Sequence, residues 1–178
     1  MKRLLLIFLP AIALSCNNGG SSSKEATKDS TASNNSSTAK DYPYKIDHPD
    51  NWDIGSSVNT MISLKSLKAW EEGNMDESIK YFADSIRVFF DGPEKKMTND
   101  SLKVILKSGR DIYKTIKVNM RDWESVISKD RSEEWVTLWY TENWETQKGE
   151  KDSLSVINDF KLRDGKITRL YEYSRKLH

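Results

Sequence analysis

The spacing of hydrophobic residues changes near residue 116. Before that point, apolar side chains recur every three or four positions, which is the period of an α-helix. The first such ladder predicts a helix that ends at Gly73, and its broad apolar surface predicts that neighbours enclose it on several sides. Its members are Val58, Met61, Leu64, Leu67 and Trp70, widened by Ile62 and Ala69.

Two further helices and a short strand are predicted before residue 116. Asn74, three residues before Glu77, is typical of an N-cap and predicts a short second helix. Its expected buried side holds Met75, Ile79 and Phe82. Residues 86–90 are β-branched and aromatic, which favours a strand, and residues 91–93 form a turn. Thr98 caps a third helix, whose inner face is expected to contain Leu102, Ile105, Leu106, Gly109, Ile112 and Tyr113.

After residue 116 the period becomes two, which is typical of strands. In residues 135–144 both faces are apolar: Trp135 and Trp139 lie on one, and Val136, Leu138, Tyr140 and Trp144 on the other. A following strand places Leu154, Val156, Asn158, Phe160 and Leu162 on one face, and Asp164-Gly165 predicts a two-residue hairpin turn. The order of helices followed by four long antiparallel strands predicts an α+β fold in which helices cover one face of a curved sheet.

The N-terminus has the features of a secretory signal. Lys2 and Arg3 precede an apolar run at residues 4–14, followed by Ser15 and Cys16. Eleven helical residues span about 16 Å, roughly half of a hydrocarbon core, which is too short for a transmembrane helix. Residues 13–16 resemble the lipoprotein box of bacteria, which implies that Cys16 is lipidated. The alternative is an ordinary cleaved signal with an incidental cysteine.

The remaining sequence divides into a linker and one domain. In residues 17–40, fourteen of the residues are Ser, Thr or Asn, and none is aromatic, so this segment is predicted to be disordered. The expected organisation is a signal peptide at 1–15, a lipidated cysteine and linker at 16–40, and a single domain at 41–178. With 28 basic and 27 acidic residues, no general affinity for nucleic acid is expected.

Few residues offer catalytic chemistry. The chain has two histidines, His48 and His178, and one cysteine, so no metal site or cofactor is predicted. Carboxylates and tyrosines remain, because a carboxyl group enclosed by aromatic rings has a raised pKa. Asp84 and Asp91 are the candidate catalytic residues. In the alternative interpretation Asp84 caps a helix end and Asp91 forms a turn.

Four segments together resemble the nuclear transport factor 2-like superfamily, in particular its SnoaL-like branch. They are residues 67–76 (LKAWEEGNMD), 81–84 (YFAD), 90–92 (FDG) and 158–167 (NDFKLRDGKI). The resemblance implies a cone-shaped, cystatin-like fold with three helices against a strongly curved antiparallel sheet, a pocket inside the cone, and possible dimers through the outer face of the sheet. The ketosteroid isomerase mechanism of this superfamily is not expected, because its functional positions align near Ser66, Phe90 and Asn158.

Asn158 is the most informative polar residue, since it shares a face with apolar side chains. Its amide is either satisfied within the core or directed at a ligand. The leading hypothesis is a lipid-anchored domain of the bacterial cell envelope that binds a small apolar or aromatic molecule without catalysis. The alternatives are a cyclase or isomerase with an Asp/Tyr pair, and a structural module acting through a dimer. The candidate ligand-binding residues are Trp70, Phe82, Phe90, Trp139, Asn158, Phe160 and Tyr171.

Overall fold

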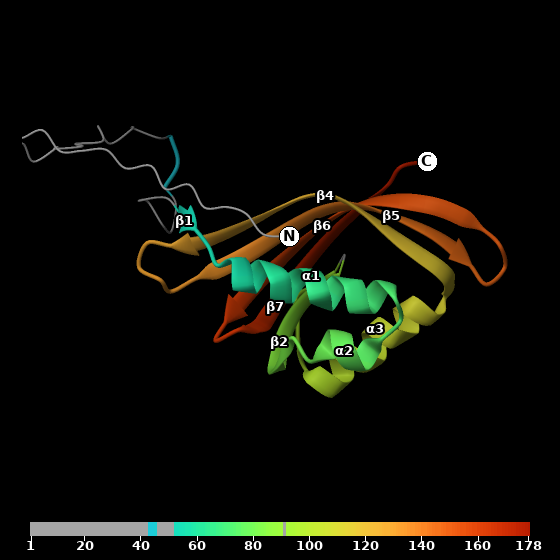
Figure 1. Ribbon diagram of the computed structural model, residues 1–178, viewed down its shortest axis with the longest axis horizontal. Helices are drawn as coiled ribbons and strands as arrows, with labels where there is room; N and C mark the ends of the chain where they lie inside the picture. Colours follow the sequence, from blue (N-terminus) through green and yellow to red (C-terminus); the bar gives the residue numbers. More distant parts are fainter. Residues whose placement is uncertain (1–42, 46–51, 91) are drawn as a thin grey trace, which may run out of the picture. The chain divides into compact units, whose positions relative to one another are not determined.

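A seven-stranded sheet bends over three helices in the computed structural model, which describes residues 43–45, 52–90 and 92–178 (Figure 1). The chain from Pro43 to His178 forms one compact unit. The helices are α1 (Ser57–Glu71), α2 (Met75–Ile79) and α3 (Asn99–Asp111). The strands are β1 (Trp52–Ile54), β2 (Phe82–Phe90), β3 (Lys95–Thr98), β4 (Tyr113–Ser128), β5 (Glu134–Thr146), β6 (Lys151–Arg163) and β7 (Lys166–Lys176).

The strands lie in the order β1-β4-β5-β6-β7-β2-β3. The four long strands β4 to β7 pair antiparallel, as the sequence predicts, whereas β2 pairs parallel with β7. Register shifts interrupt the pairing of β4 with β5, of β6 with β7 and of β2 with β7. Such irregularities increase local twist and bend a sheet, so they favour the curvature seen in Figure 1.

The predicted caps and hairpin turn are confirmed. Asn74 accepts a hydrogen bond from the Glu77 amide, and Thr98 accepts one from the amide of Ser101. Asp164 and Gly165 both have positive φ, which matches the twist of a two-residue hairpin between β6 and β7. These local signals therefore fix where two helices begin and where the last hairpin turns.

The predicted environment of α1 is wrong. Val58 is 66% exposed and Met61 is 50% exposed, so the first two members of the ladder face solvent, whereas Leu67 is buried and Leu64 and Trp70 pack against the core. Short residues complete the inner face, and the buried residues of α1 are Asn59, Ser63, Ser66, Leu67 and Ala69. One side of the helix therefore faces solvent, and the helix is not enclosed on several sides.

Two predicted boundaries also differ. Phe82 does not lie on α2: it opens β2, which starts four residues before the predicted strand. Ile112 is the C-cap of α3 and is exposed, while Tyr113 already belongs to β4. Both differences arise because strand pairing in the sheet extends into segments whose local pattern was helical.

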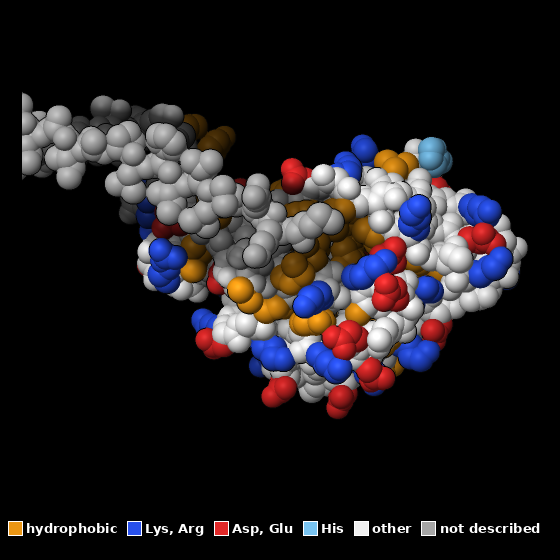
Figure 2. All heavy atoms as spheres, in the orientation of Figure 1, with side chains coloured by type: hydrophobic (Ala, Val, Ile, Leu, Met, Phe, Trp, Pro, Cys, Tyr) orange, Lys and Arg blue, Asp and Glu red, His pale blue; other side chains and the backbone are white. Residues whose placement is uncertain are grey.

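The hydrophobic core lies between the helices and one face of the sheet. It contains alternate residues of the central strands, including Val136, Leu138 and Tyr140 of β5 and Val156, Phe160 and Leu162 of β6. On the face visible in Figure 2, hydrophobic side chains gather between α1 and the sheet, and charged side chains of both signs cover the helical side. None of the helices in the described ranges has the length and hydrophobicity needed to span a bilayer. The predicted α+β arrangement is confirmed.

Candidate functional site

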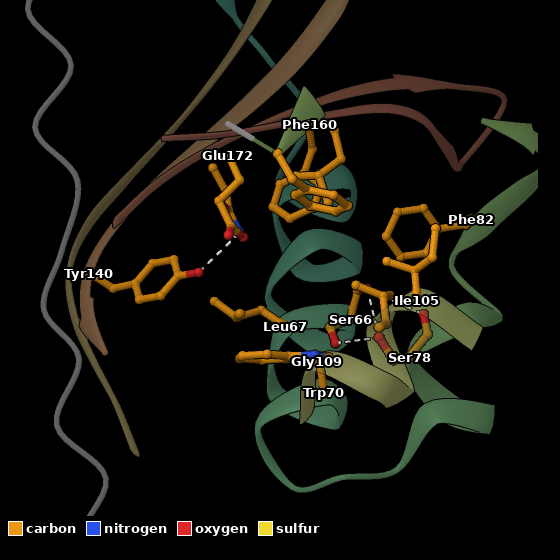
Figure 3. A pocket seen from close by; sticks show the side chains of 14 residues that line it. Ser66, Leu67, Trp70, Ser78, Phe82, Ile105, Gly109, Tyr140, Phe160 and Glu172 are labelled. Atoms are coloured by element: carbon orange, nitrogen blue, oxygen red, sulfur yellow. Dashed lines mark hydrogen bonds between the residues drawn. The ribbon is translucent and has the colours of Figure 1, made fainter. Parts of the chain in front are cut away.

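A cavity of about 290 Å³ lies between the helices and the curved sheet (Figure 3). Each helix contributes to its wall, and the sheet contributes inward-facing residues of β2, β5, β6 and β7. Most of the wall is apolar, with five polar side chains among the lining residues. The lining consists of Ser66, Leu67, Trp70, Ser78, Phe82, Phe90, Ile105, Leu106, Gly109, Tyr140, Asn158, Phe160, Leu170 and Glu172.

A polar relay crosses three strands at one side of the cavity. Asn158 of β6 is 3% exposed, and Glu172 lies opposite it in the register of β6 with β7. In the orientation that satisfies its amide, Asn158 accepts from the Tyr140 hydroxyl at 3.1 Å. Its nitrogen then donates to Oε2 of Glu172 at 3.3 Å and to the Ile157 carbonyl at 3.2 Å. Tyr140 and Glu172 point toward one another in Figure 3, so the relay presents a phenol and a carboxylate to the same space.

A second polar pair joins two of the helices at the wall. Ser66 of α1 donates to the Ser78 carbonyl at 3.2 Å, and Ser78 of α2 donates to the Ser66 carbonyl at 2.9 Å. Both side chains are buried. Because each hydroxyl finds a backbone acceptor, two polar residues are accommodated inside the domain at little cost. Their small size leaves space that larger side chains at these positions would occupy.

Glu142 forms an acidic group close to this relay. It is 6% exposed and lies two residues after Tyr140 on β5, so both side chains leave the same face of the strand. Burial, and next the charge of Glu172, raise the pKa of Glu142 from 4.5 to about 7, while Arg110 of α3 lowers it. Burial, followed by the charges of Glu172 and Glu142, raises the pKa of Tyr140 well above 10. Tyr140 is therefore a neutral hydrogen-bonding group at neutral pH.

Trp70 contributes a hydrogen-bond donor with no acceptor among the described residues. Its indole nitrogen Nε1 is inaccessible to solvent and makes no hydrogen bond there. A buried donor left without an acceptor costs about 1–3 kcal/mol. Because Nε1 has almost no accessible surface, it does not reach the open space of the cavity, and the Ser63 hydroxyl and the Trp144 indole nitrogen lack a partner in the described residues in the same way.

Five of the seven predicted ligand-binding residues lie together at the cavity. They are Trp70, Phe82, Phe90, Asn158 and Phe160. Trp139 and Tyr171 do not line it, because each sits between two inward-facing neighbours and strand alternation directs it to the opposite face of the sheet. Tyr171 instead stacks on Trp135 of β5, with ring centroids 5.9 Å apart.

Of the two predicted catalytic aspartates, the structure describes Asp84, which does not line the cavity. Asp84 is neither a helix cap nor a lining residue: it is exposed on β2, within the stretch where the register of β2 against β7 shifts. Asp91 lies outside the described residues, as does Cys16. The carboxylate among the described lining residues is Glu172 of β7, which was not among the predicted candidates.

Glu172, Tyr140 and Ser78 are lining residues that the sequence analysis missed as site candidates. Tyr140 was predicted on the face of its strand opposite Trp139, and the choice of Trp139 as the ligand-binding residue selected the wrong face. Glu172 lies two residues after the buried Leu170 on β7, so strand alternation directs both side chains to the same, inward face. Among the described residues there is no group of three His, Cys, Asp or Glu side chains that could hold a metal ion.

The fold is shared with solved structures of low sequence identity. No protein-family model matches the chain, and no curated protein matches it significantly. A cystatin-fold protein from Novosphingobium aromaticivorans superposes with a TM-score of 0.55 at 12% identity, covering 65% of this chain and 97% of that one. An NTF2-like protein from Burkholderia pseudomallei gives 0.53 at 13% identity, covering 67% and 92%. An LEH-like epoxide hydrolase from M. tuberculosis gives 0.53 at 15% identity, covering 67% and 84%.

The domain has the nuclear transport factor 2-like, or cystatin-like, cone fold. The predicted fold class is thereby confirmed. In this fold the helices close one side of the bent sheet, and the cavity described above lies inside the cone. The predicted dimer through the outer face of the sheet stays a prediction.

Proposed function

We propose that this domain binds a small, largely apolar molecule that carries at least one hydrogen-bonding group, inside the cone. The cavity has a size suited to a ligand of about one to three rings. Aromatic side chains from α1, β2 and β6 supply flat apolar surface, which favours aromatic or polyenic ligands. The polar side chains of the wall would orient the ligand.

The polar relay set into an otherwise apolar wall is the observation that carries the proposal. Tyr140, Asn158 and Glu172 bring a hydroxyl, an amide and a carboxylate to one side of the cavity. A ligand whose rings lie against Phe160 and Leu67 would pair its hydrogen-bonding group with this relay.

The fluorescent probe N-phenyl-1-naphthylamine tests this proposal. We expect the full chain to bind it with increased emission, because the probe fluoresces strongly in apolar surroundings. Gly109 of α3 lines the cavity, and a Cβ there would meet no atom within 4 Å. Gly109→Leu should therefore fill the cavity without a backbone clash, improve helix propensity by about 1 kcal/mol, and weaken probe binding at least tenfold.

Ser108→Leu is the matched control, since Ser108 is the exposed neighbour of Gly109 on the same helix. This variant adds the same side chain outside the cavity and should bind the probe like the unaltered chain. Equal probe binding by Gly109→Leu and the unaltered chain would contradict binding inside the cone. Thermal unfolding of both variants verifies that the fold is retained.

A second function, proton-transfer catalysis on a small molecule, is favoured by one observation. Glu172 and Tyr140 place an acid–base pair in the cavity, bridged by Asn158. One structural neighbour is an epoxide hydrolase, so styrene oxide is a suitable first substrate. Formation of its diol by the full chain, lost in Glu172→Gln while probe binding persists, would support this function over the non-catalytic one.

We also propose that the domain is tethered at the bacterial cell envelope and stands nearest the SnoaL-like branch of its superfamily. The support is the sequence alone. The signal-like residues 1–15, Cys16 and the polar linker support the tether, and the segments 67–76, 81–84, 90–92 and 158–167 support the branch. A doubly or triply acylated cysteine would hold the protein at the membrane. The Cys16→Ser variant should appear in the soluble fraction after cell lysis, and its continued sedimentation with membranes would contradict the tether.

A further inference from the structure

Four cationic residues form one cross-strand row on the outer face of the sheet. Lys96 of β3 pairs with Arg87 of β2, Arg87 pairs with Arg169 of β7, and Arg169 pairs with Lys161 of β6. Their neighbours along the strands, such as Val88, face the core. Like charges placed directly opposite in a sheet are destabilising, so the fold carries this row at a cost.

The row borders a hollow of about 250 Å³ that is separate from the cavity inside the cone. Two hydroxyls and one further guanidinium complete its wall, from Ser85, Thr168 and Arg163. Thr168 lies where the register of β6 against β7 shifts, and its hydroxyl donates to the Lys161 carbonyl at 3.1 Å. Thr168 therefore falls between two paired positions of β7 and lies at the same hollow as the cations.

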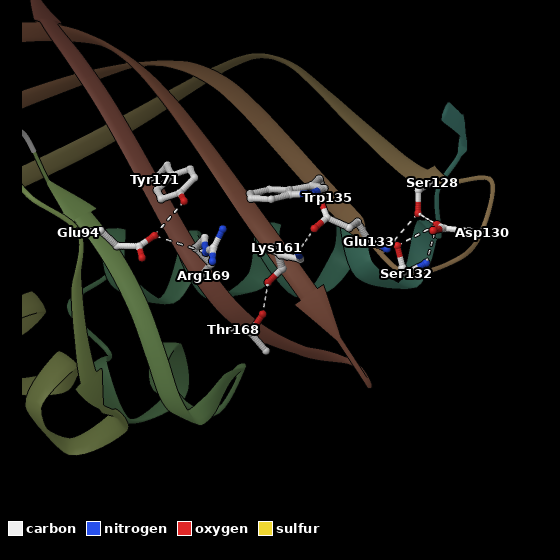
Figure 4. A network of polar contacts seen from close by, with 10 residues as sticks. All are labelled: Glu94, Ser128, Asp130, Ser132, Glu133, Trp135, Lys161, Thr168, Arg169 and Tyr171. Carbon is white, nitrogen blue, oxygen red and sulfur yellow. Dashed lines mark hydrogen bonds and ion pairs between the residues drawn. The ribbon is translucent and has the colours of Figure 1, made fainter. Parts of the chain in front are cut away.

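Carboxylates and aromatic rings hold part of the row in place (Figure 4). Glu94 accepts from Arg87 at 3.0 Å and from the Tyr171 hydroxyl at 2.9 Å, and lies 3.5 Å from Nε of Arg169. Glu133 forms an ion pair with Lys161. Two aromatic rings also attract these cations. The Lys161 ammonium lies 5.4 Å from the centroid of the Trp135 ring, and the Arg169 guanidinium lies 5.5 Å from the centroid of the Tyr171 ring.

The positive charge at the hollow exceeds what these two carboxylates neutralise. Five cationic side chains line it, and Lys96 and Arg163 form no ion pair within the described part of the chain. Both are exposed, whereas Arg169 and Lys161 are largely enclosed. The hollow therefore combines cations that are already positioned with two that are available to a ligand.

We propose that this hollow binds the diphosphate group of a small soluble molecule. Arginine presents a planar set of donors that fits phosphate oxygens in pairs, and lysine adds compact positive charge. A diphosphate carries about three negative charges at neutral pH, which equals the excess of cations over carboxylates at the hollow. The occupant would also relieve the repulsion along the row.

Calorimetric titration of the full chain with inorganic pyrophosphate tests the proposal. We expect saturable binding of one pyrophosphate per chain, weaker binding of orthophosphate, and loss of affinity at higher salt. Lys96→Ala combined with Arg163→Gln should weaken pyrophosphate at least tenfold without affecting the fold. Lys117→Ala combined with Lys148→Ala is the matched control: it removes two exposed charges far along the sheet and should leave affinity unchanged.

Three outcomes would overturn the proposal. One is the absence of saturable pyrophosphate binding, and another is an equal loss of affinity in the test and control pairs, which would indicate general charge attraction. The third is binding of the unlipidated Cys16→Ser chain to vesicles of phosphatidylglycerol that pyrophosphate fails to displace and that the Lys96→Ala, Arg163→Gln pair abolishes, which would assign the hollow to a membrane surface. The Gly109→Leu variant should bind pyrophosphate normally, which separates this site from the cavity inside the cone.

Discussion

Replacement of Glu142 by glutamine is expected to stabilise the domain at about pH 8 and to change nothing at about pH 4. The folded protein holds the Glu142 proton up to about pH 7, whereas the unfolded chain releases it near 4.5. Between these values the folded state binds more protons, so its stability falls as the pH rises. The loss amounts to at most about 3 kcal/mol above this range. A glutamine side chain has no proton to release, so the Glu142→Gln variant avoids this loss of stability.

Urea unfolding at both pH values measures this effect. Glu145→Gln is the matched control on the same strand, because hydrogen bonds from Lys114 and Lys151 lower the pKa of Glu145. Its carboxylate is favoured in the folded state, so this substitution should not stabilise the domain at about pH 8. If Glu142→Gln left the pH dependence of unfolding unchanged, the group that burial and Glu172 hold protonated would not be Glu142.

The long strands β5 and β6 could be predicted from the sequence because their buried side chains alternate with a period of two. The pattern placed Val136, Leu138 and Tyr140 on one face, and these three side chains form part of the observed core. The same alternation marked Asn158 as a polar residue on an apolar face. Its burial and its place at the cavity follow from that position, whereas its partners depend on the neighbouring strands.

Those partners escaped prediction because they depend on register between distant segments. Glu172 faces the cavity because β7 pairs with β6 so that Glu172 lies beside Asn158. The spacing within residues 166–176 does not encode which residues of another strand lie opposite. The basic row on the outer face has the same origin, since Lys96, Arg87 and Arg169 come from three strands that meet only in the folded sheet.

The prediction for α1 failed for a different reason. Hydrophobic spacing assumes that the buried face of a helix carries the largest apolar side chains. In this domain the face toward the cavity carries Ser66 beside Leu67 and Trp70, while Val58 and Met61 at the start of the helix are exposed. The short side chain of Ser66 leaves space that a larger residue would fill, and hydrophobic spacing does not register such a position.

Truncation of Phe160 to alanine is expected to destabilise the domain by about 3–5 kcal/mol. Phe160 is 2% exposed and packs in the core while one side of its ring faces the cavity. Because the cavity already lies beside the ring, few side chains are close enough to move into the space that truncation opens. The loss is a large share of the roughly 5–15 kcal/mol that a domain of this kind possesses. Guanidinium unfolding measures it.

Phe89→Ala provides the matched control, since Phe89 is a partly exposed phenylalanine of β2 on the outer face of the sheet. Its ring contacts Tyr171 and Tyr173, with centroids 6.1 and 5.7 Å away. Removing it exposes edges of two aromatic rings but opens no internal space, so a smaller loss of about 1–2 kcal/mol is expected. Equal losses in the two variants would mean that the interior beside Phe160 collapses on truncation. The cone would then be a deformable core, and the cavity would lack the rigid wall on which ligand binding depends.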